Sequence, residues 1–303
     1  MNIRKFFLSL LVTILICAVG FCAFVLFSSD TNVKEALDTS VSEKTNILVS
    51  GVDKDGTRSD VNMLFCIDAK EKTINIMSVP RDTRVKYGSR SYGKINACMG
   101  KTGGEELLIE KVRELTGMPV HNFCKVSFEG LRNIIDILGG VVFDVPVDMN
   151  YDDPVQDLHI HLKKGKQVLN GEEAEGLLRF RKGYATGDLG RIDVQQAFIK
   201  EMISQKLHIR YIFRAIPVIN ELNESVDTDM SVVYALKLAL SLRDSNNIKM
   251  NTYVLPGAPK TIGGASYYIC NESETEKLVK DVFGYMDGKE VSKDVSINEK
   301  VID

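Results

Sequence analysis

The chain has 303 residues, 26% of them charged, and a formal net charge of −3 at pH 7. This slightly acidic balance gives no reason to expect a nucleic-acid partner, because nucleic acids select basic surfaces. The length suffices for one large folded domain with additional terminal segments.

Residues 6–27 contain no charge and no proline, and they predict one transmembrane helix. At about 1.5 Å per residue the segment reaches roughly 33 Å, enough to cross a hydrocarbon core of about 30 Å. Arg4 and Lys5 precede it and Asp30 is the first charge after it. We therefore expect a single-pass protein of the cell membrane, with residues 1–5 cytoplasmic and the remainder outside. The alternative is a cleaved signal peptide, whose apolar region is typically only about 7–15 residues long.

Three segments are expected after this anchor. Residues 28–45 are polar and unpatterned, and they predict a tether. Residues 46–287 fit one folded domain. Residues 288–303 contain few core-forming side chains and predict a flexible tail.

Hydrophobic periodicity predicts alternating strands and helices along the domain. Runs rich in Val, Ile and Phe predict strands at residues 46–52, 61–68, 73–79, 122–126, 141–145 and 250–255. Helical spacing predicts helices at residues 105–116, 128–138, from Asn170 onward, and at 192–208, 230–243 and 272–285. This order indicates a single three-layer α/β/α domain with a central mixed sheet.

The cysteines and histidines indicate no metal centre. Outside the anchor lie Cys66, Cys98, Cys124 and Cys270, without a CxxC pair. We expect small buried hydrophobic residues there, with oxidation of an exported protein as the alternative. His159 and His161 alternate with apolar residues on a predicted strand, where they would form polar surface rather than a zinc site.

Charged and polar side chains, mostly Arg and Asp, recur where the predicted elements end. They are Asp53, Arg58, Asp60, Arg81, Asp82, Lys94, Arg179, Arg181, Asp188, Arg191 and Gln195. The planar fork of Arg suits phosphate oxygens, and Asp offers the hard oxygen ligands that Mg²⁺ prefers. The pattern predicts a pyrophosphate or phosphodiester ligand. Arg179 and Arg181 would reach into one cleft if the chain between them is extended.

Each of these residues also has a purely structural interpretation. A single Arg–Asp pair is usually a surface salt bridge worth about 0–1 kcal/mol, and we assign such a role to Arg84, Arg90 and Lys182. Asp53 and Asp60 could instead stabilise turns. The sequence contains no Walker motif, G-x-S-x-G elbow or H-E-x-x-H motif, so it lacks the signatures of the commonest hydrolases and nucleotide-binding proteins.

At these positions the sequence resembles the LytR-CpsA-Psr family of cell-envelope glycopolymer transferases. The matching segments are residues 46–53, 58–60, 78–83, 94–97, 138–141, 165–174, 179–181, 187–191, 256–257 and 264–268. They occur in order over residues 45–285. The resemblance implies transfer of a teichoic acid or capsular polysaccharide from an undecaprenyl pyrophosphate carrier to a muramic acid hydroxyl of peptidoglycan. It also implies a magnesium-dependent enzyme of cell wall biogenesis, with Mn²⁺ as the alternative ion.

The resemblance also implies roles for particular residues. Asp53 and Asp60 correspond to the metal ligands. The pyrophosphate-binding set is Arg58, Arg81, Lys94, Arg179, Arg181, Arg191 and Gln195. The catalytic set is Arg58, Arg81, Asp82 and Asp188, in which Asp82 either orients Arg81 or acts as the general base. Many members carry Arg immediately before the first Gln of the Gln pair, where this chain has Val194, so no extra basic contact is expected there.

Two other functions remain open at this point. One is a lipid pyrophosphatase, in which water replaces the sugar acceptor at the same metal site. The other is a non-catalytic envelope-binding or regulatory protein. A polyprenyl substrate also needs an apolar groove, for which residues 209–219 and 230–240 are candidates, although such stripes are core-facing by default.

Overall fold

The computed structural model describes residues 44–88, 91–154, 158–182, 184, 188–206, 226–243, 248–286 and 288–290. The expected anchor, most of the tether, most of the tail, Arg90 and the candidate groove segment 209–219 lie outside these residues. Within the described ranges, none of the helices combines the length and the apolar character needed to span a bilayer.

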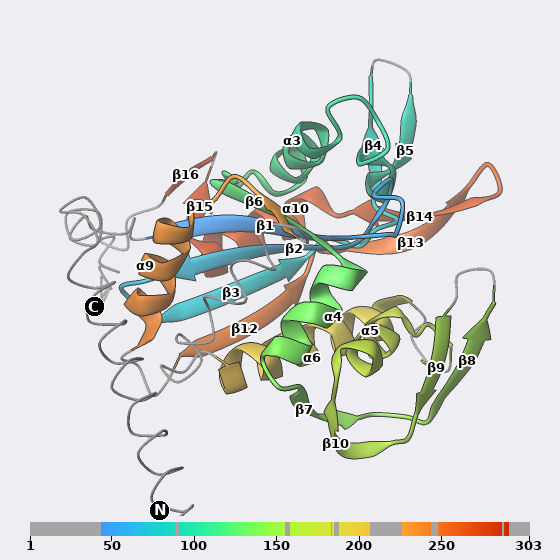
Figure 1. Ribbon diagram of the computed structural model, residues 1–303. Coiled ribbons are helices and arrows are strands. Elements are labelled where there is room, and N and C mark those ends of the chain that lie inside the picture. Colours follow the sequence, from blue (N-terminus) through green and yellow to red (C-terminus); the bar gives the residue numbers. More distant parts are fainter. Residues whose placement is uncertain are drawn as a thin grey trace, which may run out of the picture.

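A six-stranded mixed sheet forms the centre of the protein (Figure 1). Its strands, in spatial order, are β11 (Val226–Thr228), β6 (Asn122–Ser127), β1 (Lys44–Val52), β2 (Ser59–Asp68), β3 (Thr73–Ser78) and β12 (Lys249–Val254). β1 is parallel to β6, β3 is parallel to β12, and β2 lies antiparallel between β1 and β3. The carboxyl ends of β6, β1, β3 and β12 therefore meet at one edge, where β2 begins.

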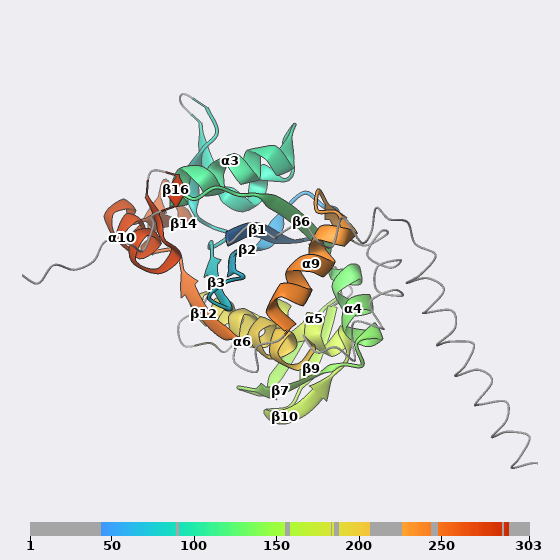
Figure 2. The ribbon, with the colours of Figure 1, turned by 90° about the vertical axis from the view of Figure 1, so that its left-hand side faces the viewer.

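Helices cover both faces of this sheet, as the sequence predicted. α3 (Gly104–Thr116) and α10 (Glu272–Leu278) lie on one face, and α6 (Asp188–Lys206) and α9 (Val232–Arg243) lie on the other (Figure 2). Successive strand residues point to opposite faces: Leu48 packs in the cluster that includes α3, whereas Ile47 packs in the cluster that includes α9. Leu238 of α9 belongs to this core, so the candidate groove segment 230–240 contributes packing to the sheet.

A second hydrophobic cluster lies beside the sheet edge. It joins α4 (Phe128–Ile137), α5 (Gly171–Arg179) and α6 to two antiparallel strand pairs. These pairs are β7 (Val141–Val145) with β10 (Gly165–Leu169), and β8 (Met149–Asp153) with β9 (Leu158–Leu162). The strand expected at 141–145 thus forms, but it pairs outside the central sheet.

Other short elements lie outside the central sheet, and the periodicity did not predict them. They are β4 (Arg84–Lys86), β5 (Tyr92–Lys94), the 3-10 helix η1 (Ile95–Cys98), β13 (Gly257–Ile262), β14 (Ala265–Cys270), β15 (Tyr285–Met286) and β16 (Lys289–Glu290). The helix expected at 272–285 ends as an α-helix at Leu278 and continues as a π-helix, η2 (Val279–Phe283).

All four cysteines of the domain are free. Cys66 and Cys98 are buried, and Cys124 and Cys270 are partly buried. Burial raises the pKa of the Cys66 thiol to about 12 and that of Cys98 to about 11. Such thiols stay protonated at neutral pH, so they behave as the small hydrophobic residues that the sequence predicted.

Candidate active site

Predicted site residues meet at the carboxyl edge of the parallel strands. Asp60 lies at the start of β2 and Arg81 follows β3, and Arg81 Nη1 lies 2.6 Å from Asp60 Oδ1. Arg181 Nη2 lies 3.6 Å from the same oxygen. A small cavity of about 10 Å³ is lined by Asp60, Arg81, Arg191 and Gln195, among others. Residues far apart in sequence thus share one charged pocket.

The backbone around Arg81 is fixed by its own hydrogen bonds. The Thr83 amide and hydroxyl both donate to the Pro80 carbonyl, at 2.9 and 2.6 Å. The Asn96 amide donates to the Arg81 carbonyl at 3.1 Å. These bonds fix the backbone of the turn, and the ion pair with Asp60 directs the Arg81 guanidinium itself.

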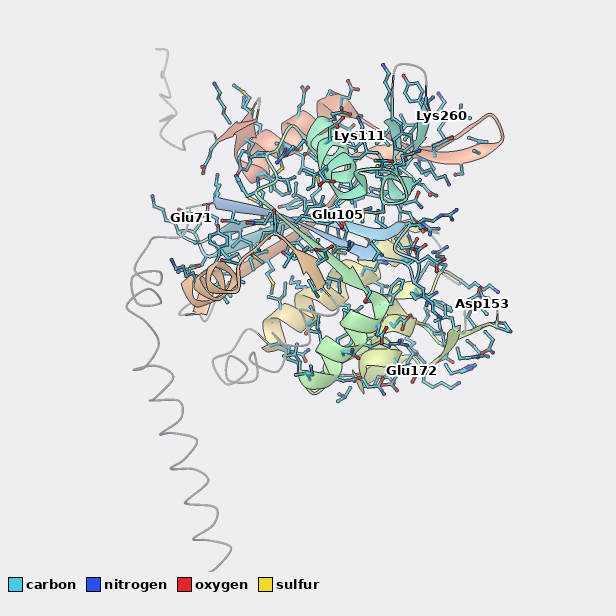
Figure 3. The ribbon with its side chains drawn as sticks, turned by 45° about the horizontal axis from the view of Figure 1, so that its top comes forward. Glu71, Glu105, Lys111, Asp153, Glu172 and Lys260 are labelled. Carbon is cyan, nitrogen blue, oxygen red and sulfur yellow. The ribbon has the colours of Figure 1, made fainter. Side chains whose placement is uncertain are left out.

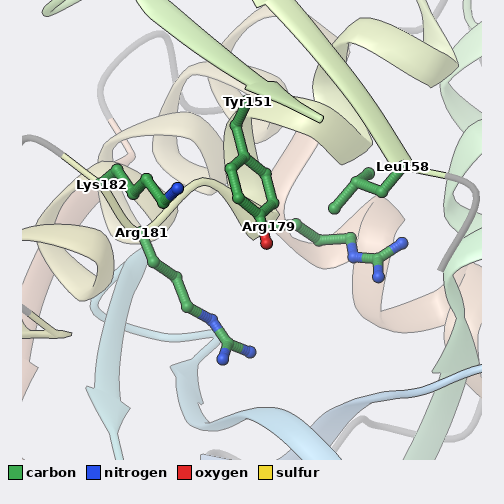
Figure 4. A pocket seen from close by; sticks show the side chains of 5 residues that line it. All are labelled: Tyr151, Leu158, Arg179, Arg181 and Lys182. Atoms are coloured by element: carbon green, nitrogen blue, oxygen red, sulfur yellow. The ribbon is translucent and has the colours of Figure 1, made fainter. Parts of the chain in front are cut away.

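Arg179 and Arg181 form the second arm of the site. α5 ends at Arg179, and Phe180 is extended (φ −62°, ψ 132°) and buried. The two arginines therefore point to the same side, as expected, and line one cavity of about 210 Å³ with Tyr151, Leu158 and Lys182 (Figure 4). A cavity walled by three cations, an aromatic ring and a leucine suits an anion that carries an apolar or sugar group.

A buried carboxylate orients Arg179. Arg179 Nη1 lies 2.7 Å from Glu175 Oε1, one helical turn earlier, and Arg132 Nη1 lies 3.2 Å from Glu175 Oε2. The Arg179 guanidinium also lies 4.7 Å from the centre of the Phe128 ring. Only 8% of the Glu175 side chain is exposed, so this carboxylate ties the α4 and α5 helices together beneath the cavity.

Arg191 is the most deeply buried arginine of the site, at 2% exposure. It pairs with Asp188 at 2.8 Å. Burial lowers the pKa of Arg191 to about 10, with Asp188 opposing this effect and Arg81 and Arg181 adding to it. The pKa of Arg181 is lowered by burial and then by the charge of Arg81. Neighbouring positive charges thus add to the lowering of the pKa of Arg181 and of Arg191, yet both side chains stay protonated at neutral pH.

Positive charge exceeds negative charge in this cluster. Arg81, Arg181 and Arg191 surround the carboxylates of Asp60 and Asp188. In the part of the chain that the structure describes, the Nε atoms of Arg81 and Arg191 are buried without a hydrogen-bond partner. Buried donors normally find an acceptor, and an unmade bond costs about 1–3 kcal/mol. An anion with several oxygens would supply both the charge and the acceptors.

The two predicted metal ligands differ in their surroundings. Asp53 Oδ1 accepts hydrogen bonds from the amides of Thr57 and Arg58, at 2.9 and 3.1 Å. This is the turn role that the sequence left open. Each of Asp53 and Asp60 uses only Oδ1 in its contacts with described residues. Two carboxylates with available oxygens at one edge fit Mg²⁺, which takes one or two such ligands plus phosphates and waters.

Other predicted residues occupy supporting positions. Lys94 Nζ lies 3.0 Å from Asp82 Oδ1, so Asp82 pairs with Lys94 instead of Arg81. Gln195 donates from Nε2 to the Leu178 carbonyl at 2.9 Å, which joins α6 to the end of α5. The Arg58 side chain is exposed in the loop after Asp53. Arg58, Asp82 and Lys94 are therefore not among the residues that line the two cavities.

Four residues of the site escaped the sequence-based prediction. Lys182, assigned above to a surface salt bridge, lines the cavity with Nζ 4.5 Å from the Tyr151 ring centre, so that assignment was wrong. Gln196 donates from Nε2 to Ser78 Oγ and the Tyr253 carbonyl, at 2.8 and 2.7 Å. The role of Glu175 could have been predicted from the sequence, because its spacing of four residues from Arg179 is that of an ion pair on a helix. Tyr151 carried none beyond its place in an alternating strand.

The fold and the site together define a mixed α/β protein with an arginine-lined cleft at the carboxyl edge of its sheet. Residues 27–283 match the model of the LytR_cpsA_psr family. The chain belongs to this family, which confirms the resemblance seen in its motifs.

Several known proteins are similar to this chain. One is the polyisoprenyl-teichoic acid–peptidoglycan teichoic acid transferase TagV of Bacillus subtilis strain 168, 30% identical over 253 residues that cover 80% of this chain and 64% of TagV. Another is the TagU transferase of Oceanobacillus iheyensis, 28% identical over 268 residues that cover 85% of this chain and 82% of TagU. The crystal structure of B. subtilis TagV matches with a TM-score of 0.69 and 30% identity, covering 80% of this chain and 96% of that chain. This chain thus spans less than two thirds of the full TagV sequence.

Proposed function

We propose that this chain is a membrane-anchored transferase of cell wall biogenesis. It moves a glycopolymer of the teichoic acid or capsular polysaccharide type from an undecaprenyl pyrophosphate carrier to a muramic acid hydroxyl of peptidoglycan. One observation carries the proposal: Arg81, Arg181 and Arg191 are gathered around only two carboxylates, with buried Nε donors unpaired among the described residues. The names of the relatives, polyisoprenyl-teichoic acid–peptidoglycan transferases, support the choice of donor and acceptor class.

The proposed reaction is a phosphoryl transfer. The acceptor hydroxyl oxygen attacks the phosphorus that carries the glycopolymer, and the bond from this phosphorus to the bridging oxygen breaks. Polyprenyl phosphate leaves, the glycan keeps its phosphate, and a phosphodiester forms. The hydroxyl proton passes to a carboxylate, for which Asp188 in the arginine cluster is our first candidate and Asp82 the alternative.

The arginines supply the charge that this reaction requires. Phosphoryl transfer depends mainly on positioning and on neutralising the charge of the phosphate oxygens. Arg81 and Arg191 line the cavity of about 10 Å³, called here the inner cavity, and Arg179 and Arg181 line the cavity of about 210 Å³, called the outer cavity. Asp53 and Asp60 would hold Mg²⁺ or Mn²⁺, which adds positive charge beside the phosphates when bound.

Replacing Arg81 tests this site directly. We expect Arg81→Ala to lower the rate of transfer from a lipid pyrophosphate donor by at least about 100-fold, because a charge-assisted contact to a phosphate is lost. The measurement is the formation of the phosphodiester product with a peptidoglycan oligosaccharide as acceptor. Arg84→Ala is the matched control, since Arg84 stacks on Tyr92 at 3.9 Å and lines neither cavity. Equal activity of both variants would contradict the assignment.

Metal removal tests Asp53 and Asp60. We expect EDTA to abolish transfer and Mg²⁺ or Mn²⁺ to restore it. Asp53→Asn should need a higher Mg²⁺ concentration for half-maximal activity, because an amide oxygen is a weaker ligand than a carboxylate. Activity that is indifferent to EDTA would remove both residues from the role of metal ligands.

Two other functions give different results in the same assay. A lipid pyrophosphatase would release lipid phosphate from the donor when no acceptor glycan is present. A non-catalytic envelope-binding or regulatory protein would retain the donor without turnover. Our proposal predicts release of polyprenyl phosphate only together with the glycan phosphodiester.

A further inference from the structure

The outer face of the β8–β9 hairpin carries polar side chains that the proposed transfer does not use. Strand alternation divides the hairpin into two faces. The inner face packs into the cluster beside the sheet or lines the outer cavity, through Met149, Tyr151, Leu158, Ile160 and Leu162. The opposite face bears Asn150, Asp152, His159 and His161, which are exposed. Figure 3 shows this hairpin at the margin of the molecule, where Asp153 is labelled.

The strand register brings three potential metal ligands together. Asp152 lies directly opposite His159, and Asn150 lies opposite His161. Asp152 Oδ1 is 2.6 Å from His159 Nδ1 and 3.2 Å from His161 Nε2. One ligand atom from each of the three residues lies within 4.8 Å of the other two. Two imidazoles thus converge on one carboxylate oxygen.

A further contact orients one of these imidazoles. His161 Nδ1 lies 2.6 Å from Asn150 Oδ1. With the Asn150 amide in this orientation, the Nδ1–H group of His161 donates a hydrogen bond to Asn150 Oδ1. This leaves a lone pair on Nε2 of the neutral ring. That lone pair faces the Asp152 carboxylate oxygen, so two acceptors approach each other. Such an approach is stable only with a proton or a cation between them. Histidine ligands of metals are commonly held by an oxygen acceptor on their other nitrogen in this way.

We propose that Asp152, His159 and His161 form a binding site for a divalent transition ion of the zinc class. Imidazole nitrogens and a carboxylate oxygen are the ligands that Zn²⁺ favours, whereas Mg²⁺ prefers oxygen ligands alone. In tetrahedral geometry, ligand distances of about 2.0–2.2 Å place the ligand atoms about 3.3–3.6 Å apart. The observed 3.2 Å is close to this range, whereas the atoms 2.6 Å apart must separate by about 0.7 Å to admit an ion. The three side chains are about half exposed, and they need only small rotations to admit the ion.

The site has a structural consequence for the outer cavity. The ion would join β8 to β9 on one face of the hairpin, whereas Tyr151 and Leu158 line the cavity from these same two strands. Binding would therefore hold together the wall that faces Arg179 and Arg181. This ion is distinct from the magnesium expected at Asp53 and Asp60, because the ligand chemistry differs.

Zinc titration of the full-length chain tests the proposal. The protein is purified in detergent, its affinity tag is removed, and bound metals are stripped with a chelator. We expect one Zn²⁺ per chain by calorimetry and a higher Tm with Zn²⁺, both unaffected by excess Mg²⁺. Asp152→Asn, His159→Ala and His161→Ala should each weaken Zn²⁺ binding at least about tenfold, and Asn150→Ala by about tenfold.

Control variants separate this site from other zinc ligands of the chain. His208→Ala and a variant with Cys124 and Cys270 replaced by Ser should bind Zn²⁺ as the wild type does. The ligand side chains are exposed, so the metal-free variants should unfold at the same temperature as the metal-free wild type. The proposal is overturned if His159→Ala and His161→Ala bind Zn²⁺ as tightly as the wild type, or if binding follows the cysteines.

Discussion

At the scale of single residues, buried charge is what distinguishes this site from ordinary surface pairs. Arg191 is 2% exposed and its one carboxylate partner is Asp188 among the described residues. A pKa of about 10 still leaves this guanidinium charged at neutral pH. A surface pair contributes about 0–1 kcal/mol, but a buried cation without full compensation is costly. Such an arrangement is a candidate functional site, because a bound anion would relieve the cost.

Glu175 shows how a residue can act through its neighbour. Its carboxylate holds Arg179 and Arg132 at 2.7 and 3.2 Å. We expect Glu175→Gln to lower the free energy of unfolding by roughly 1–3 kcal/mol, since one buried charge-assisted hydrogen bond is lost. We also expect KM for the lipid pyrophosphate donor to rise, with a smaller change in kcat, because Arg179 loses its fixed orientation.

Urea unfolding and steady-state kinetics measure these two effects. Glu172→Gln is the matched control, because Glu172 lies on the same helix and is exposed. An unchanged KM for the donor in Glu175→Gln would show that Arg179 needs no positioning by this carboxylate.

At the scale of elements, the start of α5 determines where Arg179 and Arg181 lie. Asn170 and Glu173 form a capping box at this end, which agrees with the helix start expected at Asn170. The Gly171 amide donates to Asp136 Oδ1 at 2.7 Å, which ties α5 to α4. A Cβ atom on Gly171 would lie 2.4 Å from the Arg132 carbonyl oxygen. Only glycine permits this close approach of two backbones.

A pair of glycine variants on α5 tests this packing. We expect Gly171→Ala to destabilise the protein by about 1–3 kcal/mol, because a rigid backbone must move. Gly176→Ala should be neutral or stabilising by about 0.5–1 kcal/mol, since its Cβ would meet Ile160 at an ordinary 3.4 Å and alanine favours the helix. Thermal unfolding of both variants measures the difference, and equal Tm values would contradict the close approach.

Local signals were sufficient for most elements and insufficient for their pairing. The strands β1, β2, β3 and β6 are runs rich in Val, Ile and Phe without exposed positions, so the sequence predicted their bounds closely. The strand at 141–145 has a similar composition, yet it pairs with β10 because pairing depends on contacts distant in sequence. Lys182 was misassigned for the same reason: its neighbour Tyr151 is brought to it only by the hairpin.

The site could be predicted in composition but not in detail. Arg81, Arg181 and Arg191 were recognised from their positions at element ends, and the structure brings them around Asp60 and Asp188. The pairing of Asp82 with Lys94, and the helix-joining hydrogen bond of Gln195, depend on side-chain directions that a motif does not specify. Residue type therefore indicated which side chains would gather at this edge, whereas the fold was needed to show which of them pair.

At the scale of the whole molecule, the expected anchor would place the arginine cleft beside the proposed donor. The donor proposed here is a lipid held in the membrane, and residues 6–27 are expected to hold the protein there. Tethering raises the effective concentration of the site at the bilayer surface without any new contact. Residues 28–45 would then set how far the cleft stands from the membrane.

Removal of the anchor tests this coupling. We expect a variant that lacks residues 1–27 to transfer glycan from a donor in vesicles about 10–100-fold more slowly than the full chain, because the effective concentration is lost. With a short-chain, water-soluble pyrophosphate donor the two proteins should have equal rates, since the cleft is the same.

Amino-terminal sequencing of the membrane-bound full chain is a second test, and the sequence read should begin at Met1. Equal rates with the vesicle donor, or a mature amino terminus near Gly20, would show that the segment is a cleaved signal instead of an anchor.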